Sequence, residues 1–472
     1  MLSDLTTPSP VPRRFLSELK DMFQGKPRDF TTGSLGRAIV LLAIPMVLEM
    51  IMQSIFGVVD VYFVGKLGAD AVAAVGMTDS LMVLLFAVGM GIAMSAAAMV
   101  ARRIGEKKPE EAGIAAIQAL IAGAIVSVPV AVLGVLFAPE LLGIMGATES
   151  VIAIGSGYCA IAFGSNILIL YLFIINAIFR GAGDAAKAMR VLWLANIFNL
   201  ILDPMFIFGW GPIPEMGVTG AAVATAIGRG IGVAYQLSLL FKGTGHLRVS
   251  RSQLRVDPEM MRRLARVASP GIVQYLVGTA SWMMLFRILA SFGSDALAGY
   301  TIAIRIILFA LLPSWGMGNA AATLVGQNLG ARRPDRAERA VWFACGANAV
   351  FLGLVAVGMY VFAERLIRLF TTEAAAVAFG VDCLHIVSYT YILFAFGMVI
   401  VSSFNGAGDT RTPTWINVVS YWMLQLPIAY FLSHNAGMGP RGAFIAIAVA
   451  QAALAGIAIL LFRRGTWKQQ IV

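Results

Sequence analysis

The chain repeats itself at a constant offset. Pro45 recurs as Pro270, which sets the offset at 225 residues, and the same offset relates Gly68 to Gly293. The tetrad Gly-Ala-Gly-Asp at 181–184 recurs at 406–409 without any gap between these matches. Agreement over so long a stretch is not expected by chance. The chain therefore has to fold as two structurally equivalent halves.

Each half is built from long apolar segments. Hydrophobic residues make up 59% of the chain and charged residues 13%, with a mean hydropathy of +0.82. Soluble domains carry about 25% charged residues, and a membrane-spanning helix needs about 20 apolar residues. Barrel strands would alternate every second residue, which these runs do not. The sequence predicts an all-α integral membrane protein with twelve transmembrane helices, near 38–64, 71–100, 113–136, 151–178, 187–209, 217–241, 264–291, 296–326, 337–363, 376–404, 411–432 and 441–463.

These spans divide into two lobes of six. The predicted N-lobe covers 38–241, spans 1–6, and the predicted C-lobe covers 264–463, spans 7–12. A basic linker, 242–263, joins them, and the terminal tails are 1–37 and 464–472. Because six is an even number, the lobes share one orientation as parallel repeats, with a central cleft between them. Many secondary transporters have this organisation.

The basic residues lie mostly on one side of the predicted membrane. Of 35 Lys and Arg, 28 fall on the side of the termini when the ends of the chain share a side. We therefore expect both termini in the cytoplasm and a location in the inner or plasma membrane. The net charge of +10 then reflects topology, not nucleic-acid binding. The three Cys and three His are scattered, so we expect no disulfide, no resident cofactor and no enzyme activity.

Ionisable residues inside spans are expensive, at least about 2.5 kcal/mol each, and therefore mark candidate sites. The N-lobe contains Glu49 and Asp60 in span 1 and Asp203 in span 5, with Asp79 near the start of span 2. The C-lobe has Arg287 and Arg305 in its first two spans and no deep carboxylate. These residues favour a site in the N-lobe.

Helical periodicity groups polar residues around these carboxylates. Glu49, Gln53 and Asp60 share one face of span 1, within about 40°. Glu49 is a candidate either for the substrate cleft or for pairing helices. Asn199 and Asp203 share a face of span 5, and Asn176 and Thr225 on spans 4 and 6 are candidates for the same space. Carboxylate, amide and hydroxyl oxygens suit a hard cation such as Na⁺, and a buried carboxyl suits H⁺. The residues leave both ions open, and hydrogen bonds that only tie helices together are the alternative.

Bulky apolar groups are candidates for the lining of the cleft. Met50, Met283 and Trp315 stand on the repeat-related spans 1, 7 and 8. Flexible Met and flat aromatic side chains suit aromatic or cationic guests, although plain packing would use the same residues. Pro45 is a candidate hinge if it lies inside span 1, and is harmless if it lies in the first turn.

The chain resembles the multidrug and toxic compound extrusion (MATE) family of cation-coupled exporters, from about Gly33 to Arg464. The resemblance rests on the two six-span repeats and on three motifs: Pro45 with Val59-Asp60 and Gly65-Lys-Leu-Gly68, Arg180-Gly-Ala-Gly-Asp184, and Asn199-Leu-Ile-Leu-Asp203-Pro204. Members of the archaeal and DinF-like branch keep a cation site in the N-lobe. The resemblance places it at Asp60, Asp203 and Asn199, with Tyr158, Asn176 and Thr225 as further partners, Pro45 as the kinking proline and Gln53 facing the drug cavity.

The NorM-like branch uses acids on spans 7 and 10, where this chain has Gly278 and Phe394. That departure favours the N-lobe site. We expect a monomeric antiporter driven by H⁺ or Na⁺ that exports amphipathic or cationic drugs or metabolites by alternating access. Small-molecule substrates and membrane lipids are its expected partners. A flippase for lipids or lipid-linked oligosaccharides, which has a related fold, is the alternative.

Overall fold

The computed structural model describes residues 21, 23, 29–211, 213–243, 247, 249–250 and 253–470. Much of the predicted N-terminal tail and part of the predicted linker fall outside the described residues. Over the described ranges the chain is helical, and one isolated bridge between Trp210 and Ile213 is the sole strand-like pairing.

The helices follow the repeat. The N-terminal half contains α2 (Leu35–Gly65), α3 (Ala69–Gly105), α4 (Pro109–Leu136), α5 (Ala138–Ile144), α6 (Glu149–Gly164), α7 (Asn166–Gly181), α8 (Ala185–Phe208) and α9 (Gly217–Lys242). The C-terminal half contains α10 (Pro258–Ala290), α11 (Ser294–Gly330), α12 (Pro334–Arg368), α13 (Ala374–Ser388), α14 (Tyr391–Ala407), α15 (Arg411–Asn417), the π-helical η2 (Val418–Gln425), α16 (Leu426–Tyr430), the π-helical η3 (Phe431–Asn435), α17 (Pro440–Arg463) and the short η4 (Thr466–Gln469).

The predicted fold class is confirmed. In the described residues, ten helical segments are long and apolar enough to cross a membrane, or twelve if each of two bent pairs is one span. The predicted single spans at 151–178 and 376–404 need correction, because each is a pair of helices, bent by 42° and 63°. Ser165 donates to the carbonyl of Ile161 at 2.7 Å at the first break, and Thr390 to that of Val387 at 3.0 Å at the second. Such hydroxyl bonds compete with the helical pattern and bend the chain.

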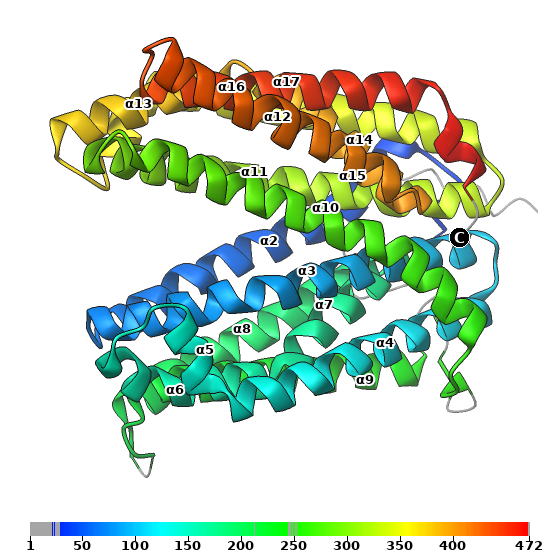
Figure 1. The fold of residues 1–472 in the computed structure, drawn as a ribbon. Helices are drawn as coiled ribbons and strands as arrows, with labels where there is room; N and C mark the ends of the chain where they lie inside the picture. The colour runs from blue at the N-terminus through cyan, green and yellow to red at the C-terminus, as the bar shows by residue number, and fades with distance from the viewer. Residues whose placement is uncertain are drawn as a thin grey trace, which may run out of the picture.

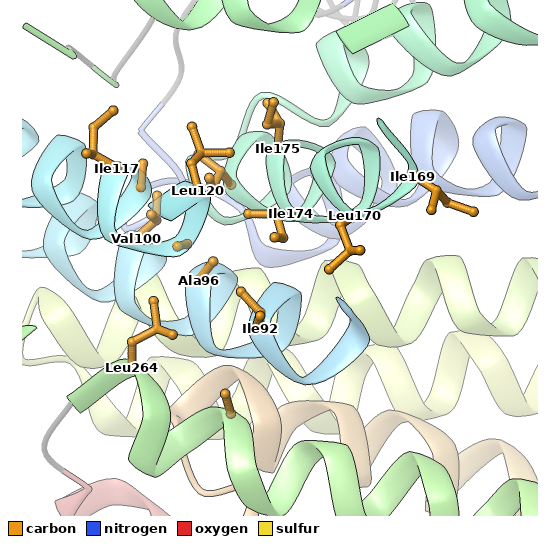
Figure 2. Close-up of a cluster of buried hydrophobic side chains, with 14 of the residues drawn as sticks. Ile92, Ala96, Val100, Ile117, Leu120, Ile169, Leu170, Ile174, Ile175 and Leu264 are labelled. Atoms are coloured by element: carbon orange, nitrogen blue, oxygen red, sulfur yellow. The ribbon is translucent and has the colours of Figure 1, made fainter. Parts of the chain in front are cut away.

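The first halves of α2 and α10 each pack into the core of the other repeat. Ile39, Leu42 and Met46 of α2 belong to a buried cluster with residues of α11, α12, α14 and α17. Leu264 and Ala268 of α10 belong to the cluster formed by α3, α4 and α7. Figure 2 shows Leu264 beneath Ala96 and Val100 of α3. In Figure 1 both helices accordingly run from one half of the molecule toward the other.

Glycines permit this exchange. A Cβ at Gly316 of α11 would lie 2.9 Å from the backbone nitrogen of Val47, and one at Gly91 of α3 would lie 2.7 Å from the carbonyl oxygen of Ala268. Small residues let helix backbones approach closely in a membrane. The two halves are therefore joined by direct backbone contact.

These contacts occupy only one end of the molecule. We call the end that carries the turns near 105–109, 181–185 and 330–334 the linker end, and the opposite one the far end. For the described residues, the hydrogen bonds and close glycine approaches between the halves involve α2 up to Val47 and α3 from Gly91 onward. On the other side they involve α10 up to Ile272 and α11 from Gly316 onward. Beyond these points the halves separate, as the diverging layers in Figure 1 show. The structure is closed at the linker end.

The chain between α9 and α10 is anchored to α4. The buried side chain of Gln118 donates to the carbonyl of Arg255 at 2.7 Å and accepts from the backbone of Asp257 at 3.1 Å. Asp257 then caps α10 by accepting from the backbone nitrogens of Glu259 and Met260. Helix α10 consequently begins at Pro258, six residues before the predicted span 7.

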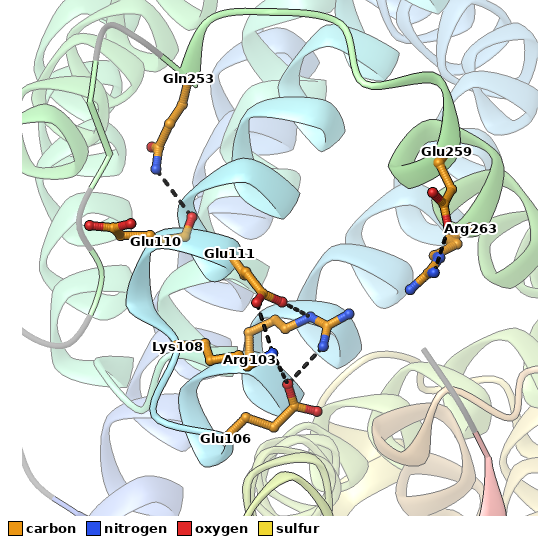
Figure 3. A network of polar contacts seen from close by, with 8 residues as sticks. All are labelled: Arg103, Glu106, Lys108, Glu110, Glu111, Gln253, Glu259 and Arg263. Carbon is orange, nitrogen blue, oxygen red and sulfur yellow. Dashed lines mark hydrogen bonds and ion pairs between the residues drawn. The ribbon is translucent and has the colours of Figure 1, made fainter.

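Charged residues gather around this anchor. Figure 3 shows Arg103 bonded to Glu106 at 2.7 Å and to Glu111 at 3.3 Å, beside Lys108, and Gln253 of the linker donating to the carbonyl of Glu110. Such partly exposed ion pairs contribute little stability. The ion pairs connect the end of α3 to the start of α4, and the Gln253 hydrogen bond connects the linker to α4.

Candidate functional site

Carboxylates lie deep in the spans of the first repeat and not at the matching positions of the second. Glu49 and Asp60 stand on α2, and the residues 225 positions later are Gln274 and Leu285. Glu49 and Asp203 are buried, at 2% and 0% exposure. A charge in the membrane is costly, so this asymmetry makes the N-lobe the candidate location for the functional site.

Asp203, Asn199 and Thr225 form one hydrogen-bonded group. Asn199 lies one turn before Asp203 on α8, and its amide nitrogen donates to Asp203 Oδ1 at 3.2 Å and to Thr225 Oγ1 of α9 at 3.0 Å. Helices α8 and α9 can lie this close because Gly228 has no side chain. A Cβ at this position would lie only 2.9 Å from the carbonyl oxygen of Ala195.

Two oxygens of this group are left without a hydrogen-bond partner. Asp203 Oδ2 and Asn199 Oδ1 are both buried and accept no bond. An unsatisfied buried polar atom costs about 1–3 kcal/mol, and more if it is charged. A proton on the carboxyl or a cation between these oxygens would remove the cost, so the donor set fits both candidate ions.

Further charged groups surround this group. Asp60 of α2, Asp79 of α3, Tyr158 of α6 and Asp203 all interact electrostatically with Arg229 of α9. Arg229 follows Thr225 by one turn, and helical side chains tilt toward the N-terminus, so its side chain leans toward Thr225. With the three carboxylates ionised, the cluster carries two more negative charges than positive ones.

The carboxylates do not converge on one metal position. In the part of the chain that the structure describes, no group of three or more His, Cys, Asp or Glu side chains is placed to hold a metal ion. A bound Na⁺ would therefore depend on mixed carboxylate, amide and hydroxyl oxygens, for which Asp203, Asn199 and Thr225 are suited.

Glu49 and Asn176 belong to a second, separate group. Glu49 Oε1 accepts from Arg180 Nη1 at 2.7 Å and from Asn176 Nδ2 at 3.2 Å, and Asn176 Oδ1 accepts from Gln236 Nε2 at 2.7 Å. Eleven residues separate Glu49 from Asp60 on α2, which is about 16 Å at 1.5 Å per residue.

The structure gives Asn176 and Glu49 hydrogen-bond partners outside the Asp203 group. Asn176 bonds to Glu49 and Gln236, and no hydrogen bond joins it to Asp203, Asn199 or Thr225. Glu49 is buried and ion-paired with Arg180 of α7, an arrangement that fits the helix-pairing alternative.

The other predicted cleft residues are at least partly open. Gln53 is exposed and Met50 is partly exposed on α2, while Met283 and Trp315 are 64% and 42% exposed. Met283 lies in the half of α10 beyond its last contact with the N-lobe, and Trp315 adjoins Gly316, where α11 meets α2. Pro45 lies inside α2, not in its first turn, so the helix lacks the bond from residue 45 to the carbonyl of Leu41.

Sequence reasoning missed three polar residues that the fold brings to these groups: Arg180, Gln236 and Arg229. Arg229 was visible as a basic residue within a span, but its partners come from four other helices. Arg180 reads as part of a turn motif, and the glutamine gives no signal of its own. Only the packing of α2, α7 and α9 brings Arg180 and Gln236 to Glu49 and Asn176.

The fold and the site define a multi-pass membrane protein of two repeat-related lobes with a buried polar cluster in one of them. The family model described as MatE matches residues 45–205 and again 270–431, and the chain belongs to this family of membrane transporters. The two matches begin at Pro45 and Pro270, the positions that define the repeat. The resemblance predicted from the sequence is confirmed.

The chain is similar to known proteins over nearly its whole length. It is 26% identical to "Probable multidrug resistance protein YoeA" of Bacillus subtilis (strain 168), over 87% of this chain and 90% of that one. It is 24% identical to "FAD transporter" of Shewanella oneidensis, over 88% and 91%. A solved structure described as the outward-facing conformation of a multidrug resistance MATE family transporter matches with a TM-score of 0.87 and 26% identity, covering 94% of this chain and 100% of that chain. These relatives are transport proteins, not enzymes.

Proposed function

We propose that the protein is a cation-coupled antiporter that exports amphipathic or cationic drugs or metabolites across the inner or plasma membrane. H⁺ or Na⁺ enters from outside and binds in the N-lobe at Asp203, Asn199 and Thr225, with Asp60 and Tyr158 nearby. Cargo binds between the lobes, near Gln53, Met50, Met283 and Trp315. The protein works as a monomer with both termini in the cytoplasm.

One observation carries the proposal: the two unsatisfied buried oxygens, Asp203 Oδ2 and Asn199 Oδ1, in the lobe that also holds the excess of carboxylates. A site that gains and loses a cation leaves such oxygens free in one state, and these two lie in the cluster where Asp60 and Asp79 add further negative charge. Coupling also requires that ion and cargo favour different states of the two lobes. Alternating access requires a state in which the lobes are apart at one end of the molecule and together at the other, and the structure has this arrangement.

Transport in reconstituted vesicles tests the proposal. A pH gradient and a Na⁺ gradient are imposed separately, and movement of a fluorescent organic cation is followed in the wild type and in Asp203→Asn and Asp60→Asn. The matched control is Asp70→Asn, which changes an exposed carboxylate in the first turn of α3. We expect transport under one gradient, its loss in both site variants, and wild-type rates in the control.

Two results would contradict this function. Transport that persists in both Asp203→Asn and Asp60→Asn would remove the coupling site from these residues. Absence of transport under either gradient, together with movement of a labelled lipid that is lost in Arg287→Ala/Arg305→Ala, would establish the flippase alternative.

A further inference from the structure

The second buried group is built around one ion pair. Glu49 of α2 is 2% exposed and meets Arg180 of α7 at 2.7 Å, with Asn176 also donating to the carboxylate. Glu49 and Arg180 are not part of the proposed coupling site, and Asp60, the residue of α2 beside that site, lies about 16 Å farther along the helix. Removing one partner of such a buried charge pair strongly destabilises the folded protein, because the other charge is left buried and unpaired. The pair therefore links α2 firmly to the C-terminal turn of α7.

The same turn of α7 is bonded to the other half of the molecule. The carbonyl of Arg180 accepts from Thr323 Oγ1 of α11 at 3.1 Å, and the carbonyl of Gly181 accepts from Gln327 Nε2 of α11 at 3.0 Å. Thr323 and Gln327 are buried. Arg180 thus holds α2 with its side chain and α11 with its backbone, at the linker end where the halves are closed.

Helix α2 itself touches α11 beside this pair. Glu49 lies one turn after Pro45, and Val47 between them meets Gly316 of α11. Proline weakens the helix at this height, so a bend of α2 would move Glu49 relative to Arg180. The ion pair, the proline and the contact between the halves form one connected unit.

The matching positions of the second repeat cannot form such a pair. At the offset of 225, Glu49 corresponds to Gln274 and Arg180 to Asn405. Gln274 Oε1 and Asn405 Oδ1 are both buried without a hydrogen-bond partner. The second lobe therefore folds with neutral residues at these positions, so the ion pair is not a general requirement of the repeat.

We propose that the Glu49–Arg180 ion pair is a latch that keeps the linker end closed by fixing the turn of α7 against α11. Arg180 is a positioning residue, and Glu49 belongs to the latch, not to the cargo surface. The inference rests on the proposed function, because a latch matters only if the two lobes move. Release of the pair allows the turn to withdraw from Thr323 and Gln327, which opens the linker end.

Distance measurement between spin labels tests the latch without ion or cargo. Labels are placed on cysteines at Glu110 and Arg339, exposed residues in the first turn of α4 and the second turn of α12, in the full-length protein in nanodiscs. The native Cys159, Cys345 and Cys383 are buried. The variants are Glu49→Gln and Thr323→Val, and the matched control is Gln274→Met in the second repeat. Melting temperature verifies that each variant is folded.

A charge-assisted hydrogen bond is about twice as strong as a neutral one. We expect Glu49→Gln and Thr323→Val each to raise the ratio of long to short label distances about fivefold to tenfold, and Gln274→Met to leave it unchanged. If Glu49→Gln fails to fold, Arg180→Lys, which keeps the charge but loses the fixed guanidinium geometry, takes its place with the same expected shift, and Thr323→Val tests the contact of the turn with α11.

An unchanged ratio in the folded variants, or an equal shift in Gln274→Met, would overturn the latch. A loss of transport in Glu49→Gln with unchanged distances would also overturn it and return Glu49 to ion or cargo handling. If the label distances shift as expected but the wild type transports nothing under either gradient, the latch is supported and the proposed function is refuted.

Discussion

Gly91→Ala provides a sharp test of how the two halves are held together. Gly91 of α3 faces α10 at the point where the halves meet. An added Cβ would lie 2.7 Å from the carbonyl oxygen of Ala268 and 2.9 Å from the backbone nitrogen of Ile272. The nearest atom, Ile272 Cγ1 at 2.5 Å, can rotate away, but the other two are backbone atoms and cannot, so α10 has to shift.

The size of the effect follows from the geometry. Overpacking by one methyl group in a close contact costs about 1–3 kcal/mol. The contact exists only while the halves are together at the linker end, so separation relieves the strain. At 1.4 kcal/mol for each factor of ten, the ratio of open to closed linker end should rise about 5-fold to 150-fold.

The assay is the label distance between positions 110 and 339, with Gly76→Ala as the matched control. Gly76 lies on the same helix and no atom comes within 4 Å of an added Cβ there. Alanine at Gly76 should leave the distances unchanged and slightly favour the helix. If Gly91→Ala behaves like Gly76→Ala, the close approach of α3 to α10 does not hold the closed state, and the argument fails.

Three further substitutions test other parts of the structure. Asn199→Ala removes the donor to Asp203 and a candidate ligand oxygen. The affinity for the driving ion, measured in the transport assay, should fall about 10-fold to 100-fold. An unchanged affinity would exclude Asn199 from the site. Trp467→Ala empties the buried position where the indole stacks on the ring of Phe462, with 4.7 Å between ring centroids. Calorimetry should show that the free energy of unfolding falls by about 3–5 kcal/mol. A fall below about 1 kcal/mol would contradict this packing. Gln118→Met leaves the backbone groups of Arg255 and Asp257 unpaired and should cost about 1–3 kcal/mol in thermal unfolding, whereas the exposed control Gln469→Met should cost nothing measurable.

Local sequence information was sufficient for much of the fold. The length and apolarity of the segments predict the spans because a helix must bury its backbone polar groups in lipid wherever it stands. The helical period also predicts that Asn199 and Asp203 lie next to each other, because residues four apart share a helix face. The bends at Ser165 and Thr390 were missed, since a hydroxyl that bonds to its own helix is indistinguishable in sequence from one that faces outward.

The part that depends on contacts between distant helices was not predictable in this way. Periodicity gives the face of a residue but not its height against a neighbouring helix, which is why Asn176 was assigned to Asp203 and lies with Glu49 instead. The partner of Glu49 is 131 residues away, and the partners of Arg229 come from four other helices. The sequence by itself determined the spans, the repeat and the lobe that holds the carboxylates, because these follow from local apolarity and charge. Only the tertiary structure decided which polar groups are joined and which end is closed, because both depend on backbone approach at glycines such as Gly91 and Gly316, where helices far apart in the chain come into contact.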